Sequence, residues 1–254
     1  YRASMDEGFT QFLTSWSLKK LDKPSASKEI DYNTVYRGYL FDAMDGEDAA
    51  LNTHSNDFGS TTGHGGGYRH VYYKTATMLY NLEYLLGDEV FRKAMSFYFN
   101  QWKIAHPYTD DFRNAITEYT QTDLTWFFDQ WLESTKHIDY SVGKVKYDKG
   151  VSRIALNRKG SMRMPIDLVI TKPNGEKVEI TVPVSDYQKP GAKNVAVWHG
   201  WDKLNPSYYV YFPGKVKQVE IDPSDRLADI DRLNNKLKPG HKLMLDRGNG
   251  MPIN

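Results

Sequence analysis

The sequence predicts a multidomain α + β protein in which a stack of amphipathic helices is followed by a small antiparallel β-sandwich. Apolar residues recur at steps of three and four up to residue 137, and at steps of two beyond it. The chain has 254 residues, of which 40% are hydrophobic, enough to fill one large domain or two smaller ones. The expected parts are residues 1–137 (helical), 138–222 (sandwich) and 223–254 (a C-terminal tail).

Five helices are expected in the first part. Gly87 should end the second as a C-cap, Asp88 and Glu89 should open the third, and Thr109 should begin the fourth as its N-cap. Their apolar stripes, helix by helix, are Phe9, Phe12, Leu13 and Trp16; Met78, Leu79, Leu82, Leu85 and Leu86; Val90, Phe91, Ala94, Met95, Tyr98 and Trp102; Phe112, Ala115, Ile116 and Tyr119; and Leu124, Phe127, Phe128, Trp131 and Leu132.

Strands are expected where apolar and polar residues alternate, at residues 164–170, 178–182, 208–212 and 216–221. Pro173-Asn174-Gly175 supplies a hairpin turn, because Asn and Gly both tolerate positive φ. In the tail, Asp222-Pro223 should start a short helix. Its apolar residues would be Leu227, Ile230 and Leu233.

The composition argues against several classes of protein. With 33 basic and 32 acidic residues the net charge is +1, and no segment gathers the basic face that a nucleic acid needs. The absence of cysteine excludes disulfides and thiolate metal sites, and leaves the compartment open. There is no apolar run long enough to span a bilayer, and no signal peptide is visible at Tyr1.

Three motifs invite chemistry that their spacing does not favour. The stretch Gly63-His64-Gly65-Gly66-Gly67 lacks the GxxxxGK[ST] spacing of a phosphate loop. A connecting loop is therefore favoured, and such a loop could line a cleft. His64 and His70 are the one close histidine pair, but they lack the tight spacing of zinc ligands, so surface or packing roles are favoured for all seven histidines. Trp198-His199-Gly200-Trp201 could form a carbohydrate platform, but packing between strands or domains is favoured.

Two further stretches are ordinary when each is taken alone. Asp6 and Glu7 suit the first turn of a helix, where the macrodipole favours negative charge, although one of them could instead bind a metal. Tyr72 is one of eighteen tyrosines, most of which must be structural.

Together these stretches resemble the aminopeptidase N family of zinc metallopeptidases, the gluzincins, which have a thermolysin-like catalytic domain. Asp6-Glu7-Gly8-Phe9 resembles the family's Asn-Glu-Gly-Phe stretch, and Tyr72-Tyr73-Lys74-Thr75 resembles its Tyr-x-Lys-Gly stretch. The similarity spans residues 5–135, continues less closely into the sandwich, and includes Leu86-Gly87-Asp88-Glu89-Val90-Phe91, Thr109-Asp110-Asp111-Phe112 and Phe128-Asp129-Gln130-Trp131. Thr75 replaces the usual Gly, which leaves Tyr73 as a competitor to Tyr72, and the sequence contains no HExxH.

The resemblance implies that Glu7 is the third ligand of one zinc ion, beside two histidines of an HExxH segment, and that Glu7 also helps hold the substrate's free α-amine. It implies that Tyr72 donates a hydrogen bond to the oxyanion as N-terminal residues are cleaved from peptides. Because HExxH is expected just ahead of Tyr1, the chain is expected to be a C-terminal fragment, inactive and binding zinc weakly by itself.

Two other functions stay open from the sequence. The chain could belong to a non-catalytic binding or scaffold protein that retains the peptidase fold. A glycosidase using Asp6 or Glu7 would need an opposed carboxylate, for which the sequence offers no candidate. The sandwich and the DRLADIDRLNN stretch of the tail resemble bacterial cell-envelope relatives, which indicates the periplasm or an exported form.

Overall fold

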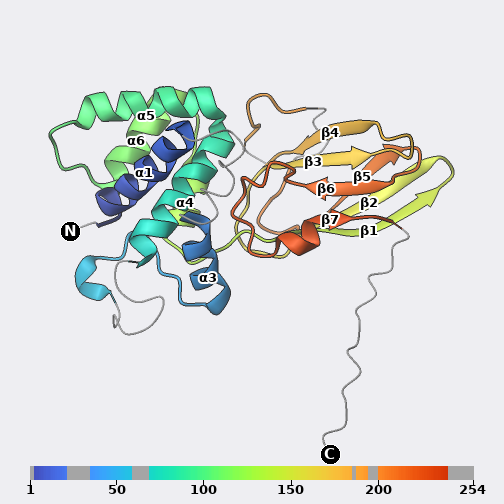
Figure 1. Ribbon diagram of the computed structural model, residues 1–254, viewed down its shortest axis with the longest axis horizontal. Helices are drawn as coiled ribbons and strands as arrows, with labels where there is room; N and C mark the ends of the chain where they lie inside the picture. Colours follow the sequence, from blue (N-terminus) through green and yellow to red (C-terminus); the bar gives the residue numbers. More distant parts are fainter. Residues whose placement is uncertain (1–2, 22–34, 59–68, 185–186, 194–199, 240–254) are drawn as a thin grey trace, which may run out of the picture.

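The computed structural model describes residues 3–21, 35–58, 69–184, 187–193 and 200–239. The helices gather at one end of the molecule and the strands at the other, and α4 runs through the middle of the helical part (Figure 1). Across the described ranges, none of the helices has the length and apolar character needed to cross a bilayer. The structure is thus a helical part followed by a β region, as the sequence predicts.

The helical part contains α1 (Glu7–Leu21), α3 (Arg37–Asp45), α4 (Arg69–Leu86), α5 (Asp88–Trp102), α6 (Thr109–Thr120) and α7 (Thr125–Leu132), with short 3-10 turns at Ala3–Met5 and Ser55–Asp57. Every residue of α4 from Lys74 onward is buried, because the other helices and the β region cover the helix. The sequence pattern did not predict α3, a nine-residue helix too short to show a clear period.

The helix ends largely follow the sequence. Gly87 has φ +78° and its N–H donates to the Glu83 carbonyl at 2.9 Å, so α4 ends there as predicted. The predicted N-cap of α6 was wrong by one residue: the cap is Tyr108, and its N–H donates to Asp111 Oδ2 at 2.8 Å.

The predicted stripe of α1 was wrong at one position. Phe9 and Phe12 are buried, but Leu13 is 53% exposed. Gly8 and Ser15 take its place on the buried face, and Ser15 Oγ lies 2.9 Å from the Tyr80 hydroxyl of α4. Small residues define this face because α1 approaches α4 closely. A prediction based on the spacing of apolar residues misses Gly and Ser, since neither counts as apolar.

The β region contains two antiparallel sheets. One has the order β1 (Tyr140–Asp148), β2 (Val151–Arg158), β5 (Ser207–Pro213); the other has the order β4 (Lys177–Val182), β3 (Ile166–Thr171), β6 (Gln218–Ile221), β7 (Lys236–Leu237). The β3–β4 turn contains Gly175 at φ +90°, as predicted. The β1–β2 hairpin was not predicted, because Ser152 and Arg158 occupy buried positions of β2 and break its apolar alternation.

The short helix predicted from Asp222 does not form. Asp222 has φ +46°, which is incompatible with a helix start, and its carboxylate accepts the Ser224 hydroxyl at 2.6 Å and the Leu227 N–H at 2.7 Å. The segment therefore turns, burying Leu227 and leaving Leu233 94% exposed, before a single 3-10 turn at Arg232–Asn235.

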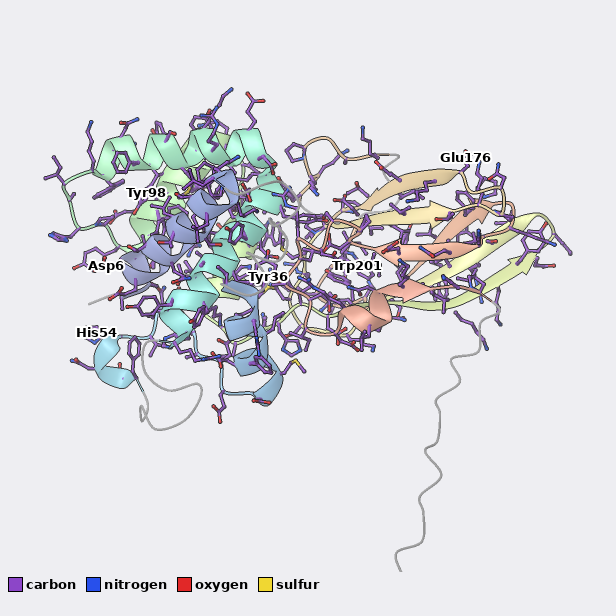
Figure 2. The ribbon with its side chains drawn as sticks, in the orientation of Figure 1. Asp6, Tyr36, His54, Tyr98, Glu176 and Trp201 are labelled. Carbon is purple, nitrogen blue, oxygen red and sulfur yellow. The ribbon has the colours of Figure 1, made fainter. Side chains whose placement is uncertain are left out.

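The two parts share one continuous apolar core, reinforced by hydrogen bonds across their junction. The Tyr187 hydroxyl donates to the Leu85 carbonyl at 2.8 Å, and the Tyr84 hydroxyl accepts from the Asp167 N–H at 3.1 Å. Trp201 lies at the end of the β region that faces the helices (Figure 2), fully buried and 5.2 Å from the Tyr140 ring. The packing role predicted for Trp201 is confirmed; Trp198 and His199 lie outside the described residues.

Candidate functional site

The helices α1 and α4 approach each other closely at Gly8. A Cβ atom at Gly8 would lie 2.2 Å from Thr75 Cβ and 2.5 Å from the Val71 carbonyl oxygen, so no side chain fits there. Glu7 precedes this contact in the first turn of α1, and Tyr72 lies between Val71 and Thr75 on α4. The contact therefore brings the two predicted site residues to the same helix crossing.

Glu7 and Asp6 differ in their surroundings. Glu7 is half-buried and begins α1, whereas Asp6 is exposed in the preceding turn, at the end of α1 remote from the sheets (Figure 2). Glu7 is thus the better placed of the two carboxylates to act together with α4. Among the described residues, no group of three His, Asp or Glu side chains could hold a metal ion, so Glu7 is one candidate ligand and not a complete zinc site.

The structure separates Tyr72 from its competitor Tyr73. The Tyr73 ring packs against α3, where a Cβ atom at Gly38 would lie 2.5 Å from it, and the Arg69 guanidinium lies 5.4 Å from the ring centroid. Arg69 also pairs with Asp42 of α3 at 3.0 Å. Tyr73 is therefore held in a packing role, and Tyr72, half-buried beside the α1 contact, stays the candidate for catalysis.

Lys74 is a buried cation to which the sequence assigned no role. Its Nζ is fully buried and donates to Asp48 Oδ2 at 2.6 Å, to the Ala49 carbonyl at 2.7 Å and to the Ser134 carbonyl at 2.9 Å. Burial lowers the pKa of Lys74 and raises that of Asp48, and the attraction between the two opposes both shifts. Lys74 thus ties two loop segments to the helix that carries Tyr72.

The described histidine of the predicted pair has a packing environment. His70 is buried on α4, with its ring centroid 4.7 Å from that of Phe58 in an edge-to-face arrangement. His64 and the glycine loop of residues 63–67 lie outside the described residues.

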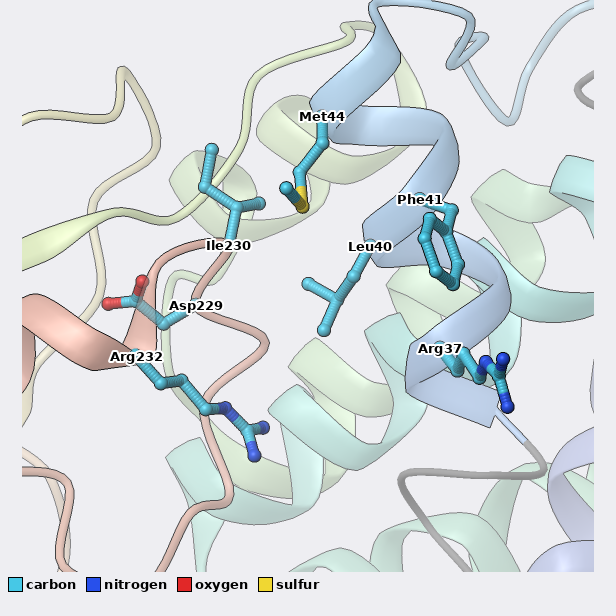
Figure 3. Close-up of a pocket in the computed structure, with 7 residues that line it drawn as sticks. All are labelled: Arg37, Leu40, Phe41, Met44, Asp229, Ile230 and Arg232. Atoms are coloured by element: carbon cyan, nitrogen blue, oxygen red, sulfur yellow. The ribbon is translucent and has the colours of Figure 1, made fainter. Parts of the chain in front are cut away.

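Three cavities lined by described residues lie away from Glu7 and Tyr72. One, of about 290 Å³, separates α3 from the segment that precedes the last 3-10 turn (Figure 3). Leu40, Phe41 and Met44 line it from α3, and Ile230 faces them. Its walls are mainly apolar, with Arg37 and Arg232 at its edge, and it offers no acid–base or metal-binding group beyond Asp229.

The close approach at Gly8 predicts that a Gly→Ala exchange destabilises the protein, the opposite of its usual effect in a helix. In most helices a Gly→Ala exchange stabilises, because alanine has the higher helix propensity. Gly8→Ala should instead lower the free energy of unfolding by about 1–3 kcal/mol, since the added methyl group forces α1 away from Thr75. Urea denaturation measures the change, with Ser17→Ala on the exposed face of α1 as the matched control. A stabilised Gly8→Ala variant would show that the helices do not touch there.

Comparison with known proteins shows which family the chain resembles. A sequence model described as the peptidase family M1 domain matches residues 2–131, which include α1, α3, α4, α5 and α6 and all of α7 except its last residue. No curated protein sequence matches the chain. The crystal structure of Legionella pneumophila aminopeptidase A in complex with aspartic acid resembles it with a TM-score of 0.53 at 14% identity, over 90% of this chain.

The structural likeness, at this low identity, concerns the fold alone, and the chain spans 24% of the length of the Legionella protein. The match to the family model covers half of the chain and contains both Glu7 and Tyr72. The chain belongs to the peptidase family M1.

Proposed function

We propose that this chain forms the C-terminal part of the active region of a zinc aminopeptidase, which hydrolyses N-terminal residues from peptides. The observation that carries the proposal is the α1–α4 contact at Gly8, which brings the helix turns of Glu7 and Tyr72 together within the segment matched to family M1. Members of this family are generally zinc metallopeptidases, and carboxylate oxygen is among the ligands that zinc accepts.

Each of the two residues has a defined role in this proposal. A bound zinc ion lowers the pKa of its water and polarises the scissile carbonyl. Glu7 supplies one carboxylate ligand to the ion and helps hold the substrate's α-amine. Tyr72 donates its phenolic hydrogen to the oxyanion, a role that suits a phenol because its ordinary pKa near 10 keeps it protonated at neutral pH.

The other zinc ligands would be two histidines of an HExxH segment ahead of Tyr1 in the complete polypeptide. Catalytic zinc normally takes three protein ligands, so the 254-residue chain alone should bind zinc weakly and show no peptidase activity. Sequencing the gene upstream of Tyr1 tests this directly. A gene without that histidine pair would support the alternative, a non-catalytic binding protein that retains the fold.

A matched pair of variants in the complete polypeptide tests the role of Glu7. Glu7→Gln should reduce bound zinc and lower kcat/KM for an aminoacyl-p-nitroanilide by more than about 100-fold, because even outer-sphere partners of a metal cost 10–100-fold. Asp6→Asn, one position away and exposed, should retain both zinc and activity. Metal content is measured by mass spectrometry and activity by release of p-nitroaniline. If Glu7→Gln kept a full complement of zinc, the ligand assignment would be wrong.

A further inference from the structure

A second cavity lies where the last helix of the helical part meets the β region. Its volume is about 610 Å³, within the range of roughly 300–1,000 Å³ typical of small-molecule sites. Trp126 of α7 forms part of its wall, and Lys136, Arg158, Arg163 and Lys203 bring four positive charges to it. Neither Glu7 nor Tyr72 contributes to it.

The backbone of Arg163 is held by the side chain of Gln130 in α7. The side-chain amide of Gln130 accepts the Arg163 N–H at 2.7 Å and donates to the Arg163 carbonyl at 3.1 Å. Only 7% of Arg163 is exposed, and its guanidinium makes no hydrogen bond or ion pair with any described residue. The α7 helix thus fixes the backbone of a largely buried arginine in the wall of the cavity.

Arg158 lies in the same wall and is nearly as buried, at 9% exposed. Its two terminal nitrogens donate to the Gly160 carbonyl at 2.8 Å and the Asp202 carbonyl at 3.2 Å. Its Nε–H finds no acceptor in the described part of the chain, and the same holds for the indole N–H of Trp126. Neither arginine forms a close ion pair with a carboxylate of the described residues, although the Asp202 carboxylate attracts Arg158 electrostatically.

Buried charges in proteins are normally paired, because removing an ion from water without compensation costs several kcal/mol. Two acidic residues, Asp123 and Asp129, also line the cavity, but neither forms an ion pair with Arg158 or Arg163. Asp129 binds Arg113 at 3.0 Å, and Asp123 accepts the Thr125 N–H at 2.9 Å. Hydrogen bonding by the side chain and then the backbone of Thr125 lowers the pKa of the Asp123 carboxyl. Lys136 and Lys203 are exposed and add positive charge around the two buried arginines.

We propose that this cavity binds a small organic anion through its carboxylate or phosphate group, with Arg163 as the principal donor and Arg158 as a second positive charge in the same wall. The planar fork of a guanidinium matches both oxyanions and binds them in a bidentate manner. The volume exceeds what a single inorganic ion fills, which leaves room along Trp126 for the rest of the molecule. The site does not depend on the peptidase function proposed for Glu7 and Tyr72.

Thermal unfolding and isothermal titration of the 254-residue chain test the proposal, with inorganic phosphate and citrate as probes and sodium chloride at matched ionic strength as the reference. Phosphate, citrate or both should raise Tm in a saturable manner and titrate to one site, and the stronger of the two identifies the preferred oxyanion. Arg163→Gln should weaken this binding at least about tenfold, the effect of losing a hydrogen bond to a charged group.

Two further variants make the result specific. Arg153→Gln, which removes an exposed arginine of β2 outside the cavity, should bind like the wild type, whereas Lys203→Gln should bind more weakly without disturbing the fold. Without a probe, Arg163→Gln should unfold at the same temperature as the wild type or higher, because it removes a partly enclosed charge that has no ion-pair partner among the described residues. The proposal is overturned if sodium chloride gives the same Tm shift as the probes, or if Arg163→Gln and the wild type bind them equally.

Discussion

Replacing Lys74 by methionine should lower the free energy of unfolding by about 3–5 kcal/mol, the usual cost of breaking a buried ion pair from one side. Methionine fills a similar volume, so the loss comes from electrostatics and hydrogen bonding more than from a cavity. The exchange leaves Asp48 charged in an apolar setting and removes the donor of the Ala49 and Ser134 carbonyls. The midpoint and slope of urea denaturation measure the effect.

Two comparisons isolate the cause. Lys93→Met removes a lysine that also pairs with a carboxylate, Glu89 at 2.7 Å, but both partners are exposed, so the midpoint should hardly move. Adding Asp48→Leu to Lys74→Met should recover part of the loss, because the stranded charge is gone while two carbonyls still lack their donor. Equal midpoints for Lys74→Met and Lys93→Met would contradict the inference that Lys74 holds the loops to α4.

In the complete polypeptide, Tyr72→Phe should lower kcat by about 10²–10³ with little change in KM, as is typical when one oxyanion donor is removed. Phenylalanine keeps the ring and its packing and removes only the hydroxyl. The reason for a selective effect on kcat is that the oxyanion exists only as the reaction proceeds, so substrate binding does not use this donor. Steady-state hydrolysis of an aminoacyl-p-nitroanilide gives both constants.

Tyr73→Phe is the matched control, since it makes the same chemical change one residue along the same helix. Its ring packs between Gly38 and Arg69, and phenylalanine preserves that packing, so kcat should stay near the wild-type value. If Tyr73→Phe proved to be the slow variant, the two tyrosines would have to exchange roles.

Apolar periodicity predicted most of this fold because burial is what it reports. It placed α4 to α7 and β3 to β6, and the family resemblance then drew Glu7 and Tyr72 from otherwise ordinary stretches. It failed where contacts are made by something other than apolar side chains. The α1 face is set by Gly8 and Ser15, so Leu13 was placed on the wrong side.

The sequence also failed to predict which charged residues are buried, and this affects the sites more than the error in α1. Lys74 and Arg163 are both enclosed, yet a cationic residue in a sequence is expected at the surface, and nothing in their neighbours distinguishes them from exposed lysines and arginines. Asp48, the partner of Lys74, lies 26 residues away in the sequence, and Gln130, the partner of the Arg163 backbone, lies 33 residues away. Only the folded structure shows that these residues are in contact.

The hydrogen bonds and apolar contacts that cross from helices to sheets bear on how such a protein can evolve. Gene segments recombine most freely when the encoded pieces fold without each other, and here Tyr84, Gln130 and Tyr187 each reach across the boundary. If the β region were replaced by that of a distant relative, these hydrogen bonds would lose their partners and apolar surface would be exposed on both parts. Selection should therefore have kept the two halves together as one inherited unit.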